Sequence, residues 1–236
     1  MSIDCIVHAR APELPESARR LAALPTAAIS DSEDRVWGAP GIMPVPAWAP
    51  RPLFGPALTV RTRHGDNLVV HKALDLARPG DVLVVDAGGH TDRAILGGLM
   101  CRYAQIRGLA GLVIDGAVRD VDDIEALGLP VYARAVTHVG PYKDGPGEIG
   151  GPVTIGGTVV RSGDVVVADR DGVVFVAVER IEPVLAVAEP LIENERRIVE
   201  AITRGTWDRT WIDQKLHVVP APPRPIETKE DGAGRR

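Results

Sequence analysis

A short run of charged residues, Asp115-Gly116-Ala117-Val118-Arg119-Asp120, holds the densest set of candidate functional groups in the sequence. It follows Gly111 to Ile114, an apolar stretch that predicts a buried strand. Ligands of open α/β sheets bind beyond the carboxyl ends of the strands, and Gly116 would let the backbone turn sharply there. On an extended loop Arg119 and Asp120 would point in different directions, so that Asp120 could hold a metal ion while Arg119 holds an anion.

Composition alone leaves a structural alternative open for the same residues. Asp120 could cap the short acidic helix expected over 121–127, with Asp122 and Asp123 favouring the positive end of the helix dipole. A second candidate is Gly97-Gly98-Leu99-Met100, because glycines near a helix start leave free backbone N–H groups with room for a carboxylate or phosphate. Two glycines in a helix can equally serve close packing.

Other chemistries find less support. The six histidines include no pair at i, i+4 spacing with another metal-type ligand, so spacing predicts no zinc site. Lys143 could form a Schiff base, although its Gly/Pro-rich loop favours a solvated lysine. The Gly-rich run from Asp86 to His90 has neither a P-loop lysine nor dinucleotide spacing, and the chain contains no Gly-x-Ser-x-Gly elbow.

Alternating strands and helices must position these residues. The pattern predicts an α/β domain with a partly parallel sheet, followed by a more β-rich half. Helices are expected over 12–24, 67–77 with Asp66 as cap, 94–107, 121–127 and 179–204 with a break near Pro190. Strands are expected over 57–63, 81–86, 111–115, 131–134, 153–155, 158–160, 164–168 and 173–178. Residues 38–56 are expected to form an irregular loop.

Bulk properties exclude several classes of protein. The chain has 236 residues and a net charge of −5, and no basic run interleaves with aromatic residues, so we expect no nucleic-acid partner. Cys5 and Cys101 make neither a disulfide framework nor a Cys-x-x-Cys metal pair. We find no apolar secretion signal and no stretch near the ~20 residues that a spanning helix needs, so we expect a cytoplasmic protein without membrane contact.

Several of these segments together resemble the RraA-like superfamily, over roughly Thr26 to Gly205. The superfamily includes 4-hydroxy-4-methyl-2-oxoglutarate / 4-carboxy-4-hydroxy-2-oxoadipate aldolases and the regulator of ribonuclease activity A. The resemblance is carried by Asp81–Asp86, the Gly97-Gly98 helix start, Gly108–Asp120, Gly163–Asp169 and Asp171-Gly172-Val173.

The resemblance implies an α/β/β/α sandwich like a swivelling phosphohistidine domain. We expect it to occupy residues 1–215 as a single domain, with 216–236 as a flexible tail. It also implies homotrimers or homohexamers with sites between subunits. The implied cofactor is a divalent cation, magnesium or alternatively manganese.

Individual residues match the family's motif. The resemblance implies that Asp120 binds the metal, that Arg119 contacts the substrate's oxygen, and that the amides of Gly97, Gly98, Leu99 and Met100 hold the carboxylate of a 2-oxo acid. Glu195 aligns with a glutamate supplied across a subunit boundary. Gly98 departs from the pattern, because aldolase members often carry an acidic residue there that helps arrange water at the metal.

The function implied is release of pyruvate from a 4-hydroxy-2-oxo acid or from oxaloacetate, since a hard cation stabilises the enolate that either reaction forms. Two alternatives remain open: a non-catalytic regulator that binds a protein partner, and a relative acting on another oxo or hydroxy acid. The regulator branch lacks the aspartate that matches Asp120, so the sequence favours an enzyme.

Overall fold

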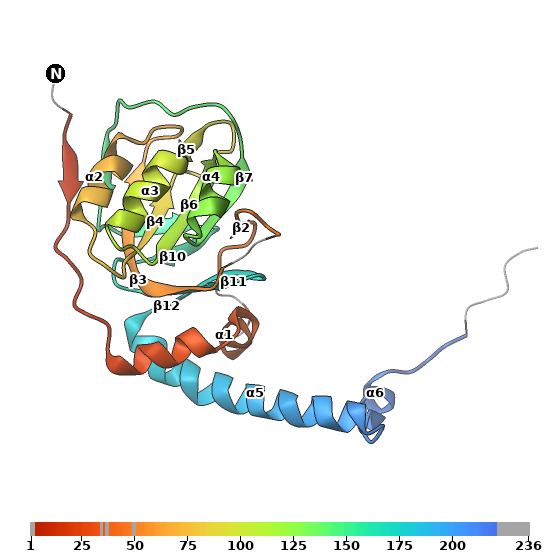
Figure 1. Ribbon diagram of the computed structural model, residues 1–236. Coiled ribbons are helices and arrows are strands. Elements are labelled where there is room, and N and C mark those ends of the chain that lie inside the picture. Colours follow the sequence, from red (N-terminus) through yellow and green to blue (C-terminus); the bar gives the residue numbers. More distant parts are fainter. Residues whose placement is uncertain (1–2, 34, 36–37, 49–50, 221–236) are drawn as a thin grey trace, which may run out of the picture. The chain divides into compact units, whose positions relative to one another are not determined.

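The computed structural model describes residues 3–33, 35, 38–48 and 51–220 of the chain. The chain divides into two compact units, residues 1–193 and 194–236. The first unit contains a ten-stranded mixed sheet and the helices up to the first half of α5 (Ile181–Thr203), the long helix that continues into the second unit (Figure 1). Among the described residues every helix is too short or too polar to cross a lipid bilayer.

A parallel core lies at the centre of the sheet. The order is β1-β8-β3-β4-β6-β7-β2, in which β3, β4, β6 and β7 are neighbours running in one direction. The bounds along this path are β1 (Cys5–Val7), β8 (Gly147–Ile149), β3 (Leu53–Thr62), β4 (Val82–Asp86), β6 (Gly111–Val118), β7 (Val131–Val136) and β2 (Met43–Pro44). Nearly every residue of β4 and β6 is buried, which explains their continuous apolar sequences.

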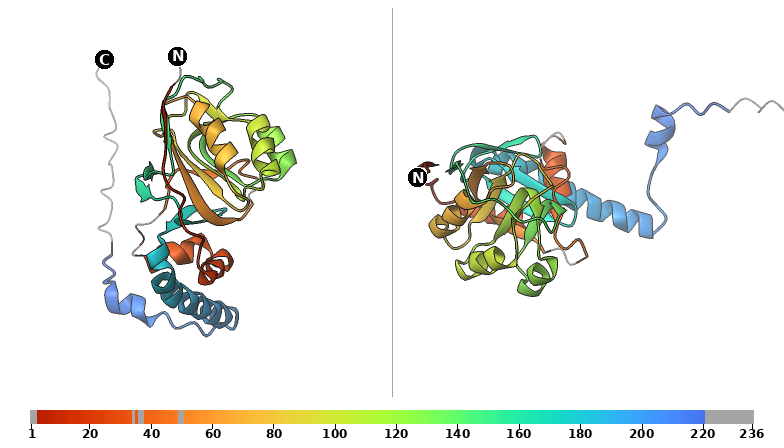
Figure 2. Two further views of the ribbon diagram at one scale, coloured as in Figure 1. Left: turned by 90° about the vertical axis from the view of Figure 1, so that its left-hand side faces the viewer. Right: turned by 90° about the horizontal axis from the view of Figure 1, so that it is seen from above.

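Three helices cover one face of the parallel core: α2 (Leu68–Leu76), α3 (Gly98–Ile106) and α4 (Val121–Leu127). Figure 2 shows them together on one side of the strands. Their apolar sides pack on the sheet in one buried cluster that includes Leu74, Leu112 and Ile124. This packing holds the start of α3 and the start of α4 close to the sheet's edge, where the candidate residues lie.

Further strands cover the opposite face. They are β9 (Val153–Ile155), β10 (Thr158–Val160), β11 (Val165–Asp169) and β12 (Gly172–Val176). β9 and β10 form an antiparallel hairpin around Gly156-Gly157, as the sequence predicts, and β11 pairs with β12 and with the first half of β3. A second buried cluster, including Tyr132 and Phe175, fills the space between these strands and the parallel core.

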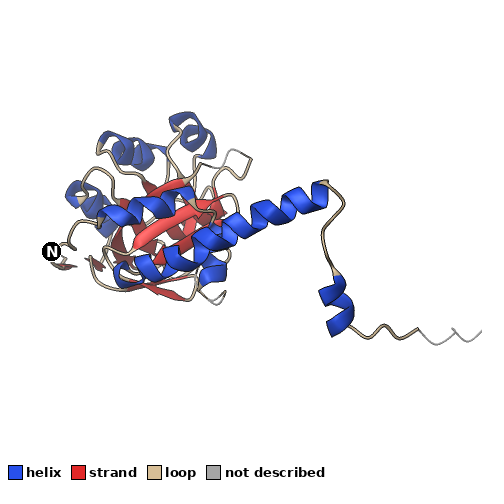
Figure 3. Cartoon of the chain, turned by 90° about the horizontal axis from the view of Figure 1, so that it is seen from below, coloured by secondary structure: helices blue, strands red, loops and turns tan. Residues whose placement is uncertain are grey.

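A final layer of helices packs outside β11 and β12. It contains η1 (Glu16–Ala23), a 3₁₀ helix, then α1 (Thr26–Ser32) and the first turns of α5 (Ile181–Thr203). The third buried cluster, with Leu21, Ile29 and Val184, joins them to β11 and β12. Three buried clusters between four layers give the α/β/β/α sandwich that the resemblance implies, and Figure 3 shows the strands between two sets of helices.

Several local predictions were wrong, most importantly near the candidate site. Ala94–Leu96 is a strand, β5, that pairs with the end of β6, so the helix begins at Gly98 instead of Ala94. The three apolar residues are buried beside β6, and this tertiary pairing places the helix start two residues beyond Leu96, although Leu96 is at helical spacing from Leu99 and Met100. Strand β6 likewise continues to Val118, beyond the predicted end at residue 115, so that Arg119 directly follows its last residue.

Other boundaries also differ. Residues 53–56 belong to β3, because the first half of that strand pairs with β11, and were wrongly assigned to an irregular loop. A helix at Thr26–Ser32 was missed, although Pro25 at its N-cap suits a helix start. Asn67 is the N-cap residue of α2, while the expected cap, Asp66, accepts a hydrogen bond from the Leu68 amide at 2.9 Å.

Helix α5 passes through Pro190 without the expected break. In the second unit a short helix, α6 (Thr210–Lys215), follows, and residues 216–220 form no regular structure. Residues 221–236, the greater part of the predicted tail, lie outside the described residues. The expected domain boundary at residue 215 stays a prediction.

Candidate active site at the carboxyl edge of the sheet

The candidate residues meet because two parallel strands end side by side. β5 ends at Leu96, next to Val118 at the end of β6. Gly97 follows β5 as the N-cap residue of α3, and Arg119-Asp120 follows β6 as the entry to α4. The Arg119 amide donates to the Leu96 carbonyl at 3.0 Å, which ties the two chain segments together. The two segments that the sequence singled out, Gly97–Met100 and Arg119-Asp120, therefore lie side by side.

Asp120 adopts an unusual backbone conformation. Its φ of 58° and ψ of 51° are left-handed, a conformation that costs a non-glycine residue roughly 1–2 kcal/mol. Asp120 precedes α4, but its side chain makes no capping hydrogen bond to that helix. Its Oδ2 instead accepts the Gly98 amide at 3.1 Å, at the start of α3. Asp120 therefore occupies the N-cap position of α4, as the structural alternative predicts, but its carboxylate is directed at the start of α3 and does not cap α4.

Gly97 makes room for this carboxylate. A Cβ at position 97 would lie 2.3 Å from Asp120 Oδ2 and 2.9 Å from Arg119 Cγ. Any side chain at this position would displace both charged groups. The glycine therefore serves a close approach between the start of α3 and the Arg119-Asp120 pair.

Gly98 makes room for a second carboxylate. A Cβ at position 98 would lie 2.6 Å from Asp123 Oδ2 and 2.7 Å from Asp123 Cβ. The Asp123 side chain, from the first turn of α4, occupies the space into which a residue at position 98 would project. The sequence analysis assigned Asp123 only a helix-dipole role, because a neighbour on a different element is not visible from spacing.

Arg119 lies beside Asp120, with Nε 3.6 Å from Oδ2, and each side chain is 41% exposed. The expectation that the two side chains point in different directions was wrong, since the left-handed backbone at Asp120 is not the extended loop on which it rested. The guanidinium also lies close to Gly140, where a Cβ would be 3.1 Å from Arg119 Nη1. Arg93 donates to the Gly140 carbonyl at 2.8 Å, so two arginines meet at this loop.

The floor of the site is buried. Asn67 is 2% exposed and donates to the Ile95 carbonyl at 2.8 Å, whereas its Oδ1 has no partner among the described residues. Burial, with a smaller contribution from the Asp120 carboxylate, raises the pKa of the Cys101 thiol to about 12. Cys101 is therefore protonated at neutral pH and is unsuited to act as a nucleophile.

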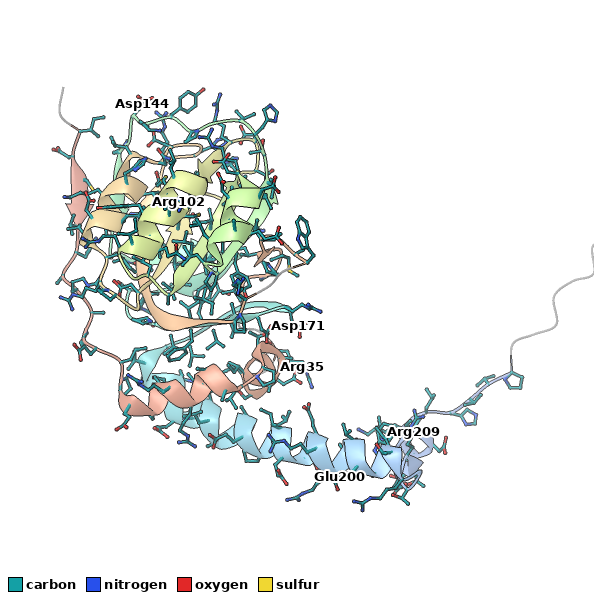
Figure 4. The ribbon with its side chains drawn as sticks, in the orientation of Figure 1. Arg35, Arg102, Asp144, Asp171, Glu200 and Arg209 are labelled. Carbon is teal, nitrogen blue, oxygen red and sulfur yellow. The ribbon has the colours of Figure 1, made fainter. Side chains whose placement is uncertain are left out.

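The remaining predicted residues lie elsewhere. Lys143 is exposed in the loop between β7 and β8, without the desolvation that activates Schiff-base lysines. Asp144, the next residue, pairs with Arg63 at 3.6 Å and is labelled in Figure 4. Glu195 is an exposed residue of α5 in the second unit. Its contribution across a subunit boundary stays a prediction.

The donor set suits a hard divalent cation. Asp120 and Asp123 both bring carboxylate oxygens to the start of α3, and hard cations such as Mg²⁺ prefer oxygen ligands and retain several waters. Asp120 is partly exposed, which leaves room for water and substrate at the ion. A cavity of about 630 Å³ lies elsewhere, lined by Arg10, Arg78 and other residues, and none of the candidate residues borders it.

The chain is similar to several known proteins. A protein of Halalkalibacterium halodurans named "Putative 4-hydroxy-4-methyl-2-oxoglutarate aldolase" is 36% identical over 195 residues, 82% of this chain and 92% of that protein. A Thermus thermophilus protein named 4-hydroxy-4-methyl-2-oxoglutarate aldolase is 38% identical over 107 residues, 45% of this chain and 65% of that protein.

A solved structure is also similar. The RNA-processing inhibitor RraA from Thermus thermophilus has a TM-score of 0.59 and 31% identity, over 65% of this chain and 92% of that one. Residues 26–175 match the RraA-like family, described as Aldolase/RraA, and this segment contains both halves of the candidate site. The chain belongs to the RraA-like family.

Proposed function

We propose that the protein is a divalent-metal-dependent carbon–carbon lyase that releases pyruvate from a 4-hydroxy-2-oxo acid or from oxaloacetate. The observation that carries the proposal is the placement of Asp120. Its carboxylate accepts the Gly98 amide at the start of α3, and Arg119 lies beside it. The names of the aldolase relatives support the same reaction class.

The start of α3 supplies the carboxylate site. The backbone N–H groups of the first helical turn have no acceptor within the helix, and the helix dipole favours an anion there. Gly97 and Gly98 carry no side chains of their own there, and the Gly98 amide already donates to Asp120 Oδ2. The next amides of the turn, those of Leu99 and Met100, would hold the carboxylate of a 2-oxo acid. Backbone donors fix the substrate without adding a group that titrates.

Arg119 acts on the oxygen that gains charge. Cleavage of the carbon–carbon bond leaves an enolate, and the guanidinium can donate charge-assisted hydrogen bonds to its oxygen. A bound Mg²⁺ or Mn²⁺ would be held by Asp120 and would supply Lewis-acid stabilisation of the same charge. Hydrogen bonding between Gly98 and Asp120 Oδ2 orients the carboxylate before substrate arrives.

Asp123 is our candidate for the acidic function that Gly98 cannot supply. Its Oδ2 occupies the space beside the Gly98 Cα, in the first turn of α4, and can order water or accept a proton there. Glu195 of a neighbouring subunit is the second candidate for this proton transfer.

Pyruvate release tests the proposal. Purified protein is assayed with 4-hydroxy-4-methyl-2-oxoglutarate and with oxaloacetate, each with magnesium and then with EDTA. We expect turnover of at least one substrate that EDTA abolishes and Asp120→Ala removes, while Asp122→Ala, at an exposed neighbour, retains it. Turnover that persists in EDTA and is blocked by borohydride would assign the reaction to Lys143 and overturn the metal-dependent mechanism.

A regulatory function is the second candidate, favoured by the similarity to the RNA-processing inhibitor RraA. Such a protein would bind a protein partner through its oligomer surface and would need no reaction centre. Stable capture of one partner by the wild-type protein, together with no pyruvate release from either substrate, would favour this function over the lyase.

A further inference from the structure

A second cluster of metal-type ligands lies on the same edge of the sheet. One ligand atom from each of His64, His90 and Asp92 lies within 4.8 Å of the other two. The imidazole rings of His64 and His90 are stacked, with centroids 3.5 Å apart and an interplanar angle of 14°. His64 Nε2 is 2.5 Å from Asp92 Oδ1. All three side chains are exposed, so water and ions reach them freely.

The sheet brings these residues together. His64 follows the end of β3 by two residues, while His90 and Asp92 lie in the loop between β4 and β5. β3 and β4 are neighbouring parallel strands, with Arg61 opposite Asp86 at their ends. Residues that are 26 positions apart in sequence are therefore adjacent, which explains why a search for local histidine spacing predicted no zinc site.

Backbone contacts fix the loop that carries two of the ligands. The amides of Ala87 and Gly89 both donate to the Asp115 carbonyl, at 3.3 and 3.0 Å, and the Ala94 amide donates to Val139 at 2.9 Å. Gly88 and Gly89 have φ values of 70° and 72°, a backbone conformation that residues with side chains rarely adopt. A site on such a preformed loop loses little conformational entropy when an ion binds.

The third ligand is held in a similar way. The Asp66 amide donates to the Arg63 carbonyl at 3.0 Å, closing the turn in which His64 lies. Gly65 has a φ of 64°, and a Cβ there would lie 2.7 Å from Arg93 Cδ. The turn is therefore packed against the residue that follows Asp92, and His64 keeps its place beside the other two ligands.

The donor set differs from that of Asp120. Two imidazole nitrogens and one carboxylate oxygen suit Zn²⁺, Ni²⁺, Co²⁺ or Cu²⁺, whereas Mg²⁺ prefers oxygen ligands and keeps its water. Three protein ligands on an exposed surface leave further coordination positions for water.

We propose that His64, His90 and Asp92 bind one divalent transition-metal ion, with Zn²⁺ as the reference ion. This site is separate in its ligands from Asp120, and its existence does not depend on the proposed lyase activity. Because β5 leads from Asp92 to Gly97 within a few residues, an ion bound here would also fix the segment that enters the candidate active site.

Metal retention tests the site on the full-length protein. The protein is loaded with Zn²⁺, dialysed against millimolar Mg²⁺ and analysed for zinc by mass spectrometry, and Co²⁺ loading is followed by its d–d absorption bands. We expect about one equivalent of zinc in the wild type and a loss of at least fivefold in the His64→Gln/His90→Gln double variant. Circular dichroism establishes that each variant is folded.

Two control variants test whether the retained zinc is bound by this cluster and not elsewhere on the protein. His138→Gln removes an exposed histidine outside the cluster, and Asp120→Ala removes the oxygen-donor site; both are expected to retain the zinc of the wild type. Equal zinc retention by the folded double variant and the wild type would overturn the proposal. So would loss of the zinc in Asp120→Ala, or failure of the wild type to retain zinc through dialysis.

Discussion

Two clusters on one edge of the parallel sheet differ in chemistry and in origin. The Asp120 cluster, which consists of Arg119, Asp120 and Asp123, places carboxylate oxygens and an arginine at the start of α3. The His64 cluster presents two imidazoles and one carboxylate on loops. On the two proposals, a single sheet edge carries one oxygen-donor site for a hard cation and one imidazole-containing site for a softer cation. The strand ends set the position of each cluster, and the loop residues set its donor type.

Removal of the Asp120 carboxylate should have the largest effect, because only the Asp120 cluster is proposed to take part in the reaction. Asp120→Ala should lower pyruvate release about a thousandfold, the scale on which loss of a group that stabilises transition-state charge is measured. Steady-state kinetics with saturating Mg²⁺ checks this. A turnover number within twofold of the wild type would show that the Asp120 cluster is not the reaction centre.

A change at Arg119 should have the next largest effect. Arg119→Lys keeps the charge but loses the planar fork of donors, and kcat/KM should fall about a hundredfold on that account. Arg102→Lys is the matched control, because Arg102 is exposed on α3 (Figure 4). If Arg119→Lys and Arg102→Lys had the same kcat/KM, Arg119 would have no specific part in the reaction.

Gly97→Ala tests whether the close approach at α3 matters. The added methyl group would lie 2.3 Å from Asp120 Oδ2 and must displace it. Misplacement by about 1 Å can cost up to about 10² in rate, so we expect a fall of about ten- to a hundredfold with the fold intact. Gly80→Ala is the comparison variant: no atom lies within 4 Å of a Cβ there, but its φ of 87° strains any side chain, so this variant should lose stability while keeping its turnover. Unchanged kinetics in Gly97→Ala would mean that the Asp120 carboxylate can move without loss.

The smallest effect concerns the other cluster. Asp92→Asn removes the charge of one ligand and should weaken Zn²⁺ affinity about tenfold, at the lower end of what changes around metal sites cost. Isothermal titration calorimetry of this variant and of Asp144→Asn, an exposed acid outside the cluster, makes the comparison. Equal weakening in both variants would indicate a general surface effect and would remove Asp92 from the site.

The same comparison explains what could be predicted from the sequence. Arg119 and Asp120 are contiguous and directly follow an apolar strand, so both their importance and their place at the sheet edge were predictable. The four-layer fold followed from the resemblance and is confirmed by three buried clusters.

Features that depend on tertiary neighbours could not be predicted. Ala94–Leu96 was predicted to begin a helix but is a strand, because it pairs with β6. Asp123 fills the space beside Gly98 from another helix, and His64 reaches His90 across two parallel strands. In each case the decisive contact joins residues far apart in the chain, and local periodicity carries no information about it.

The most direct test of the central claim is a crystal structure of the protein soaked with Mn²⁺ and pyruvate. The account predicts an anomalous peak at the Asp120 carboxylate, with the pyruvate carboxylate on the first-turn amides of α3 and Arg119 on the keto oxygen. An Asp120 side chain that bonds only the Gly98 amide, with neither ion nor pyruvate at the start of α3, would contradict it.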